Sequence, residues 1–89
     1  MMSTTETHLE FPCTFPIKAM GLSGTDFDVL VVEIIARHAG PLTEGAVTTR
    51  PSSNGKYISV TVTVHAENKR QLDAIYSELT AHERVLMAL

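Results

Sequence analysis

The chain has 89 residues, of which 44% are hydrophobic and 19% charged, a balance that fits one globular domain with one core. Its formal net charge is −3 and its seven basic residues are scattered, which argues against a nucleic-acid partner because proteins that bind nucleic acid carry a basic patch. The apolar runs are too short to cross a bilayer, so no membrane partner is expected.

The polar residues 1–10 predict a flexible N-terminal tail, followed by a single domain over residues 11–89. This tail lacks the basic and apolar regions of a secretory signal. Cys13 is the only cysteine, so the chain can form neither an internal disulfide nor a zinc site built from several thiolates. These features together favour a cytoplasmic protein. No metal or other cofactor is predicted, because the four histidines are not spaced as ligands on one helix face.

A first strand is predicted over residues 14–21 from its alternating pattern. Its inward residues are Phe15, Ile17 and Ala19. Ser23 or Thr25 is expected to cap the helix that follows, and this helix runs to about Ala39, where Gly40 suits the residue after its end. The apolar stripe of this helix comprises Phe27, Leu30, Val31, Ile34 and Ile35.

A hairpin is predicted next. Residues 46–52 form a weak strand, and Pro51 places it at an edge of the sheet, because proline cannot donate to a strand ladder. Asn54-Gly55 is a strong turn signal. Lys56–His65 then alternates without a break. Its apolar face holds Ile58, Val60, Val62 and Val64, and its polar face holds Tyr57, Ser59, Thr61, Thr63 and His65.

Asn68 is expected to cap a second helix, with Gln71 placed for a capping box. The apolar stripe of that helix comprises Leu72, Ile75, Tyr76 and Leu79. Residues 84–89, RVLMAL, are predicted to form a fourth strand at the other edge of the sheet, with Leu86 and Ala88 pointing outward.

The order β-α-β-β-α-β predicts an α+β fold, a ferredoxin-like two-layer sandwich. Its antiparallel sheet has the strand order 4-1-3-2 and carries both helices on one face. The valines of the third strand then meet the helices. The opposite sheet face is left bare, and its central residues are Lys18, Tyr57, Ser59, Thr61 and Thr63.

Four segments, EFPCTFPIKAMG, VVEIIARHA, PSSNGKYISVTVTV and the ending MAL, resemble the YbeD-like family of small bacterial proteins. The Pro-Ser-Ser-x-Gly-x-Tyr turn and the Lys-x-Met-Gly strand end are the most specific parts, and the resemblance extends from Glu10 to Leu89. It implies a ferredoxin-like fold similar to amino-acid-binding ACT regulatory domains, and it implies no particular activity.

The residues argue against an enzyme. The loop after the first strand lacks the cysteines of copper carriers and the arginine of acylphosphatase-like domains. Tyr57 is the only aromatic residue at the open-face positions of the central strands, whereas RNA-binding domains of this shape stack bases on several. Ser52 and Ser53 lie in a turn, and their hydroxyls are expected to bond local backbone.

The first functional hypothesis is therefore a non-enzymatic regulatory or protein-interaction module. Its working surfaces would be the open sheet face and the Met20–Thr25 loop, and Lys18 is the residue whose reversal to glutamate should test the open face. The short apolar edge at residues 84–89, with Leu86 and Ala88, adds a homodimer or an unidentified protein as a partner, because unprotected edges pair readily.

The alternative is an ACT-like sensor of an amino acid or another carboxylate. Its small-molecule ligand would bind where the first loop runs into a helix N-terminus, which attracts anions. The residues of this loop are Met20, Gly21, Leu22, Ser23, Gly24 and Thr25. Gly21→Val is expected to remove ligand binding while the fold survives.

Overall fold

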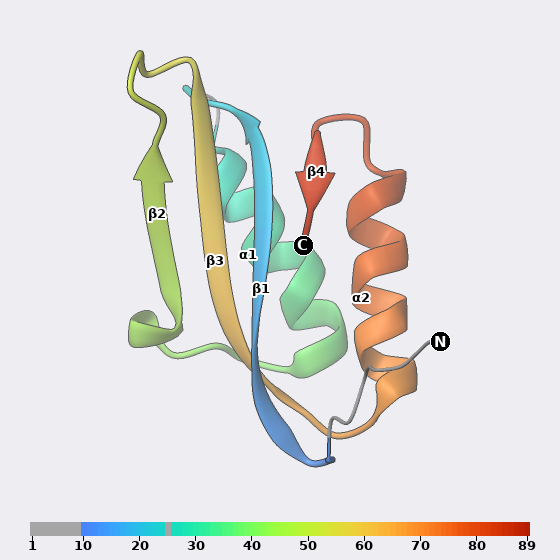
Figure 1. Cartoon of the computed structure of the whole chain (residues 1–89). Helices are drawn as coiled ribbons and strands as arrows, with labels where there is room; N and C mark the ends of the chain where they lie inside the picture. The colour runs from blue at the N-terminus through green and yellow to red at the C-terminus, as the bar shows by residue number, and fades with distance from the viewer. Residues whose placement is uncertain (1–9, 25) are drawn as a thin grey trace, which may run out of the picture.

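The computed structural model describes residues 10–24 and 26–89, and Figure 1 shows their arrangement. Its elements are β1 (Cys13–Leu22), α1 (Phe27–Ala39), the 3-10 helix η2 (Glu44–Ala46), β2 (Val47–Pro51), β3 (Tyr57–Ala66), α2 (Lys69–Ala81) and β4 (Met87–Ala88). The four strands form one antiparallel sheet in the order β2-β3-β1-β4, which confirms the predicted α+β topology. The predicted tail lies outside the described residues, apart from Glu10.

The central pair of strands, β1 and β3, determines which side chains face the helices. The two strands are paired over their whole length, from Cys13↔Ala66 to Leu22↔Tyr57. Because successive side chains alternate between the two faces of a strand, this register places one apolar set on a single side. That set, Ile17, Ala19, Val60, Val62, Val64 and Ala66, is fully buried. In Figure 1, α1 lies behind β1 and β3, and no helix lies in front of them.

The N-terminus of α1 differs from the prediction. Its N-cap residue is Asp26, in the left-handed conformation with φ of 55°, and the side chain of Asp26 makes no capping hydrogen bond. The predicted cap at Ser23 is wrong, because its hydroxyl donates to the backbone carbonyls of Gly55 and Lys56. Ser23 therefore ties the end of β1 to the β2–β3 hairpin. Thr25, the other predicted cap, lies outside the described residues. The helix does end at Ala39, as predicted.

The strand β4 is much shorter than the predicted strand over 84–89. The backbone N–H of Val85 donates to the carbonyl of His82 at 3.0 Å, so the chain turns before it reaches the sheet. This turn directs Val85 into the core, where its side chain is 8% exposed. Hydrogen bonding to β1 therefore begins only after Val85, where the N–H of Leu86 donates to the carbonyl of Met20 at 2.8 Å.

The outward direction predicted for Ala88 is wrong, whereas Leu86 is exposed, as predicted. Ala88 pairs with Ala19, and residues directly opposite each other point to the same side of a sheet. Ala88 therefore packs against the core. Leu86 lies on the same side, at the rim of the domain, and remains 57% exposed. Met87 and Leu89 face the open side instead, because a shift of one residue exchanges the two faces.

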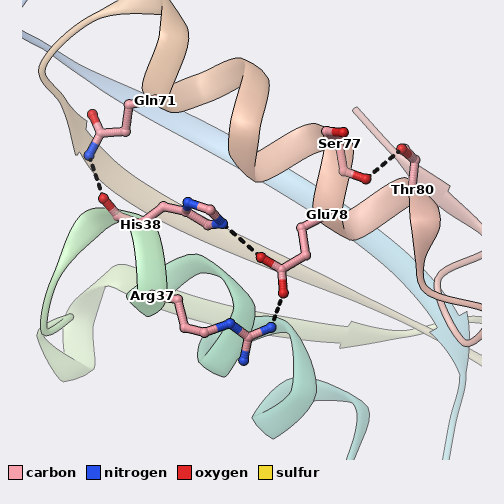
Figure 2. Close-up of polar contacts among 6 residues, drawn as sticks. All are labelled: Arg37, His38, Gln71, Ser77, Glu78 and Thr80. Carbon is pink, nitrogen blue, oxygen red and sulfur yellow. Dashed lines mark hydrogen bonds and ion pairs between the residues drawn. The ribbon is translucent and has the colours of Figure 1, made fainter.

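A polar cluster joins the two helices (Figure 2). Arg37 and His38 at the end of α1 both contact the carboxylate of Glu78 on α2, with 2.7 Å between His38 Nε2 and Glu78 Oε1. Gln71 donates from Nε2 to the backbone carbonyl of His38 at 2.9 Å. The hydrogen bond from Arg37, and then that from His38, lowers the pKa of Glu78. This cluster fixes α1 against α2 outside the apolar core.

No helix in the described part of the chain is long and apolar enough to cross a membrane.

Gly21 is a point of close approach between sheet and helix, and replacing it should destabilise the domain. A Cβ atom at Gly21 would lie 2.7 Å from Cζ of Phe27 and 2.8 Å from the carbonyl oxygen of Arg84. We expect Gly21→Ala to lower the free energy of unfolding by about 2–3 kcal/mol, as overpacking of a core does. A valine side chain would meet the same two groups, so the close packing argues against the expectation that Gly21→Val leaves the fold undisturbed.

Thermal unfolding measures this effect, with Gly45→Ala as the matched control. A Cβ atom at Gly45 has no neighbour within 4 Å, so the melting temperature of the Gly45→Ala variant should stay near that of the wild type. A melting temperature for Gly21→Ala as high as that of the control would contradict the close packing of Phe27 on β1.

The contacts of Glu78 should make stability depend on pH. Since its pKa is lowered in the folded state, the ionised carboxylate stabilises the fold above the pKa of an unfolded glutamate, about 4.3. That stabilisation is lost as the pH falls through the lowered folded value. We expect Glu78→Gln to reduce the melting temperature at pH 7 and to have little effect at the acid end of the range.

Melting curves from pH 7 to pH 3 measure this difference, with Glu33→Gln on the exposed side of α1 as the control. An equal effect of both substitutions at every pH would show that the cluster contributes nothing specific.

Candidate functional site

The open face of the sheet brings together five residues that the sequence predicted as a surface. Lys18 lies opposite Thr61, and β1 presents Met20 opposite Ser59. The five predicted residues, Lys18, Tyr57, Ser59, Thr61 and Thr63, all lie on this face because they occupy alternating positions of the paired strands β1 and β3. The structure thus assembles one continuous surface from two strands that are far apart in the sequence.

The hairpin strand β2 extends this face with residues that the sequence reasoning missed. Thr48 lies opposite Thr61, and Arg50 lies opposite Ser59. The signal was present, because the turn at Asn54-Gly55 fixes the hairpin register, and counting back from it places Arg50 on the polar face. On the other side, Met87 lies opposite Met20 and adds an apolar margin.

Two shallow hollows meet at Arg50 on the open face. The larger has a volume of about 360 Å³ and is lined by Lys18, Thr48, Arg50, Ser59 and Thr61. The smaller has a volume of about 170 Å³ and is lined by Met20, Arg50, Pro51, Ser52, Tyr57, Ile58 and Ser59. The larger hollow therefore combines two cationic side chains with three hydroxyl groups, a set that donates hydrogen bonds to anionic or neutral acceptors.

Tyr76 of α2 fixes the strand segment beside Lys18. Its hydroxyl donates to the carbonyl oxygen of Leu89 at 2.8 Å. The same oxygen accepts from the backbone N–H of Lys18 at 3.1 Å, and Leu89 N–H donates back to Lys18. Partial burial raises the pKa of Tyr76, so its hydroxyl keeps its proton and remains a donor at neutral pH. The backbone at Lys18 is thus fixed by Leu89 within the sheet, and Leu89 is fixed in turn by Tyr76 of the helix layer.

The five described residues of the predicted ligand loop, residues 20–24, do not line one hollow. Met20 faces the open side of the sheet, Gly21 is buried, and Ser23 bonds the hairpin. Leu22 and Ser23 line a separate hollow of about 410 Å³, together with Glu83, Arg84 and Leu86. Gly24 has a φ of 94°, which suits a sharp turn, and Thr25 lies outside the described residues.

Two histidines and the cysteine make contacts within the domain. His82 accepts a hydrogen bond from the backbone of Arg84 through Nδ1, and His65 pairs with Glu67 at 3.3 Å. Cys13 packs against the core. Among the residues that the structure describes, no three His, Cys, Asp or Glu side chains come together as metal ligands.

Comparisons with known proteins identify the family. The family model described as "Protein of unknown function (DUF493)" matches residues 6–89. A UPF0250 protein of Neisseria gonorrhoeae is 48% identical over 81 residues, which cover 91% of this chain and 89% of that protein. A UPF0250 protein of Paraburkholderia phymatum is 45% identical over the full length of both chains.

A solved structure supports the fold independently. The solution structure of protein HP0495 from H. pylori superposes with a TM-score of 0.72 and covers 97% of this chain and 90% of that one. Its sequence identity is 16%, so the likeness concerns the fold alone. The family model and the full-length relatives confirm the resemblance drawn from the turn and strand motifs: this chain belongs to the DUF493 (UPF0250, YbeD-like) family.

Proposed function

We propose that this chain is a non-enzymatic regulatory or protein-interaction module, and that its open sheet face binds a partner protein. The observation that carries the proposal is the continuous surface from Arg50 to Met87, which crosses all four strands and is covered by no helix of residues 10–24 and 26–89. Such an arrangement is rigid, because every strand beneath it is paired. Rigid surfaces bind with little loss of conformational entropy.

The side chains of the face support protein binding over catalysis. Short hydroxyl residues, Thr48, Ser59, Thr61 and Thr63, make most of it flat and able to exchange hydrogen bonds with a partner. Met20 and Met87 add an adaptable apolar margin. We place the interaction in the cytoplasm, since the single Cys13 suits a reducing compartment.

The hollow next to β4 favours a second candidate function, the ACT-like sensor. It is lined by two apolar residues, Leu22 and Leu86, and by charges of both signs from Glu83 and Arg84. An amino acid has the matching combination of charges and apolar surface. The ligand would lie in this hollow rather than on the helix N-terminus, because the carboxylates of the N-cap residue Asp26 and of Asp28 in the first turn already lie at the positive end of the dipole.

Site-specific photo-crosslinking in the host bacterium tests the leading proposal. A photoreactive amino acid at Thr63 on the open face should give a discrete adduct with a partner, and the same group at Ser77 on α2 should not. Lys18→Glu should reduce the adduct yield about tenfold, because it reverses the charge in the middle of the face that the partner contacts.

Arg70→Glu, the same charge reversal on the helix layer, is the matched control and should preserve the adduct. Equal adducts from Thr63 and Ser77, or an adduct that is unaffected by Lys18→Glu, would contradict the proposal.

Thermal shift with pooled amino acids tests the sensor. A ligand that binds only the folded chain raises its melting temperature. Leu86→Asp should abolish the shift, and Met87→Asp, one residue away and on the opposite face, should retain it. No shift at millimolar concentrations, or a shift that survives Leu86→Asp, would exclude this site for the compounds tested.

A further inference from the structure

The open face has a charge opposite to that of the whole chain. None of the four strands contains an aspartate or glutamate, although the chain has ten of them and a net charge of −3. The cations on this face are Lys18 and Arg50, both exposed and both beside the larger hollow. The sheet side is thus cationic and the acidic residues belong to the helices and loops.

These two cations differ from others in the domain. Arg37 pairs with Glu78, and Lys69 pairs with Asp73 at 2.9 Å. Within residues 10–24 and 26–89, no carboxylate forms an ion pair with Lys18 or Arg50. Their charges are available to a partner without the loss of an internal ion pair.

The register sets the distance between the two charges. Lys18 on β1 lies across from Thr61 on β3, which lies across from Thr48 on β2, and Arg50 is two residues along β2 from Thr48. With the usual strand spacing and rise, the Cα atoms of Lys18 and Arg50 are about 12 Å apart. In an extended segment, side chains at positions i and i+4 point the same way and lie about 13 Å apart. The two spacings match.

We propose that the open face binds an acidic segment of its partner protein, in which two carboxylates four residues apart contact Lys18 and Arg50. The hydroxyl group of Thr61 between them would donate to a backbone carbonyl of the segment, and the hydroxyl of Ser59, which donates to the Arg50 carbonyl at 3.3 Å, would accept from a backbone N–H of the segment. This inference rests on the proposed function and specifies the chemistry of the partner.

Other occupants fit these observations less well. A second copy docked face to face would bring Lys18 and Arg50 against the same two cations. Single-stranded nucleic acid needs aromatic platforms, and Tyr57, whose ring already has the Lys56 ammonium 5.4 Å from its centroid, is the only aromatic residue on the face. A small anion would use one cation and leave the other without a partner.

NMR titration of the full-length labelled chain with a peptide that contains Glu-Thr-Val-Thr-Glu tests the proposal. Amide shifts should cluster around Lys18, Arg50, Ser59 and Thr61. The peptide with glutamine in place of both glutamates should bind about tenfold more weakly, as loss of two exposed ion pairs would give. The double variant Lys18→Ala/Arg50→Ala should lose affinity by a similar factor, and Lys69→Ala/Arg70→Ala should not.

Three results would overturn the proposal: no shifts at millimolar peptide, equal binding of the glutamine peptide, or tighter binding of inorganic phosphate or a DNA oligonucleotide at the same residues. If the crosslink from Thr63 persists while the acidic peptide fails, the protein-binding function stands and its acidic chemistry is wrong. If both fail, the proposed function itself is wrong.

Discussion

The pairing of β1 with β3 is the interaction on which the rest of this structure depends. It joins the N-terminal strand to a strand some forty residues later and sets the register for both edges of the sheet. On one side it brings Ile17 and Ala19 beside the valines of β3, and on the other it brings Lys18 beside Thr61. The core and the candidate interaction face are therefore two consequences of one register, and a slip of one residue would exchange them.

The same pairing explains why a rather acidic chain has a cationic sheet face. Side chains on this face are confined to alternate strand positions, and most of these positions hold hydroxyl residues, methionines or the two cations. Carboxylates are depleted in strands because they fit poorly there, so they collect in helices and loops. This separation of cations from carboxylates bears on function because Lys18 and Arg50 are exposed on the open face. In the helix layer, the contacts of Arg37 and His38 with Glu78 hold α1 against α2.

The parts of the fold that could be predicted from the sequence are those with local physical causes. The alternation of β3 and the cap of Asn68 on the N–H of Gln71 at 2.8 Å are of this kind. Ser23 could not be placed, because its partners at residues 55 and 56 come from a distant turn. The faces of residues 85–89 could not be assigned either, since an unbroken apolar run carries no alternation. The place of Arg50 on the open face could be predicted only by counting the hairpin register back from the turn.

The central claim is that the open sheet face is covered by a partner in the cell. Lysine-reactive footprinting tests it most directly, because Lys18 lies on that face and Lys69 lies on α2 of the same molecule. Labelling in living cells is compared with labelling of the purified chain. The account predicts that Lys18 is protected in cells while Lys69 reacts equally in both samples. Equal reactivity of Lys18 in cells and in isolation would contradict it.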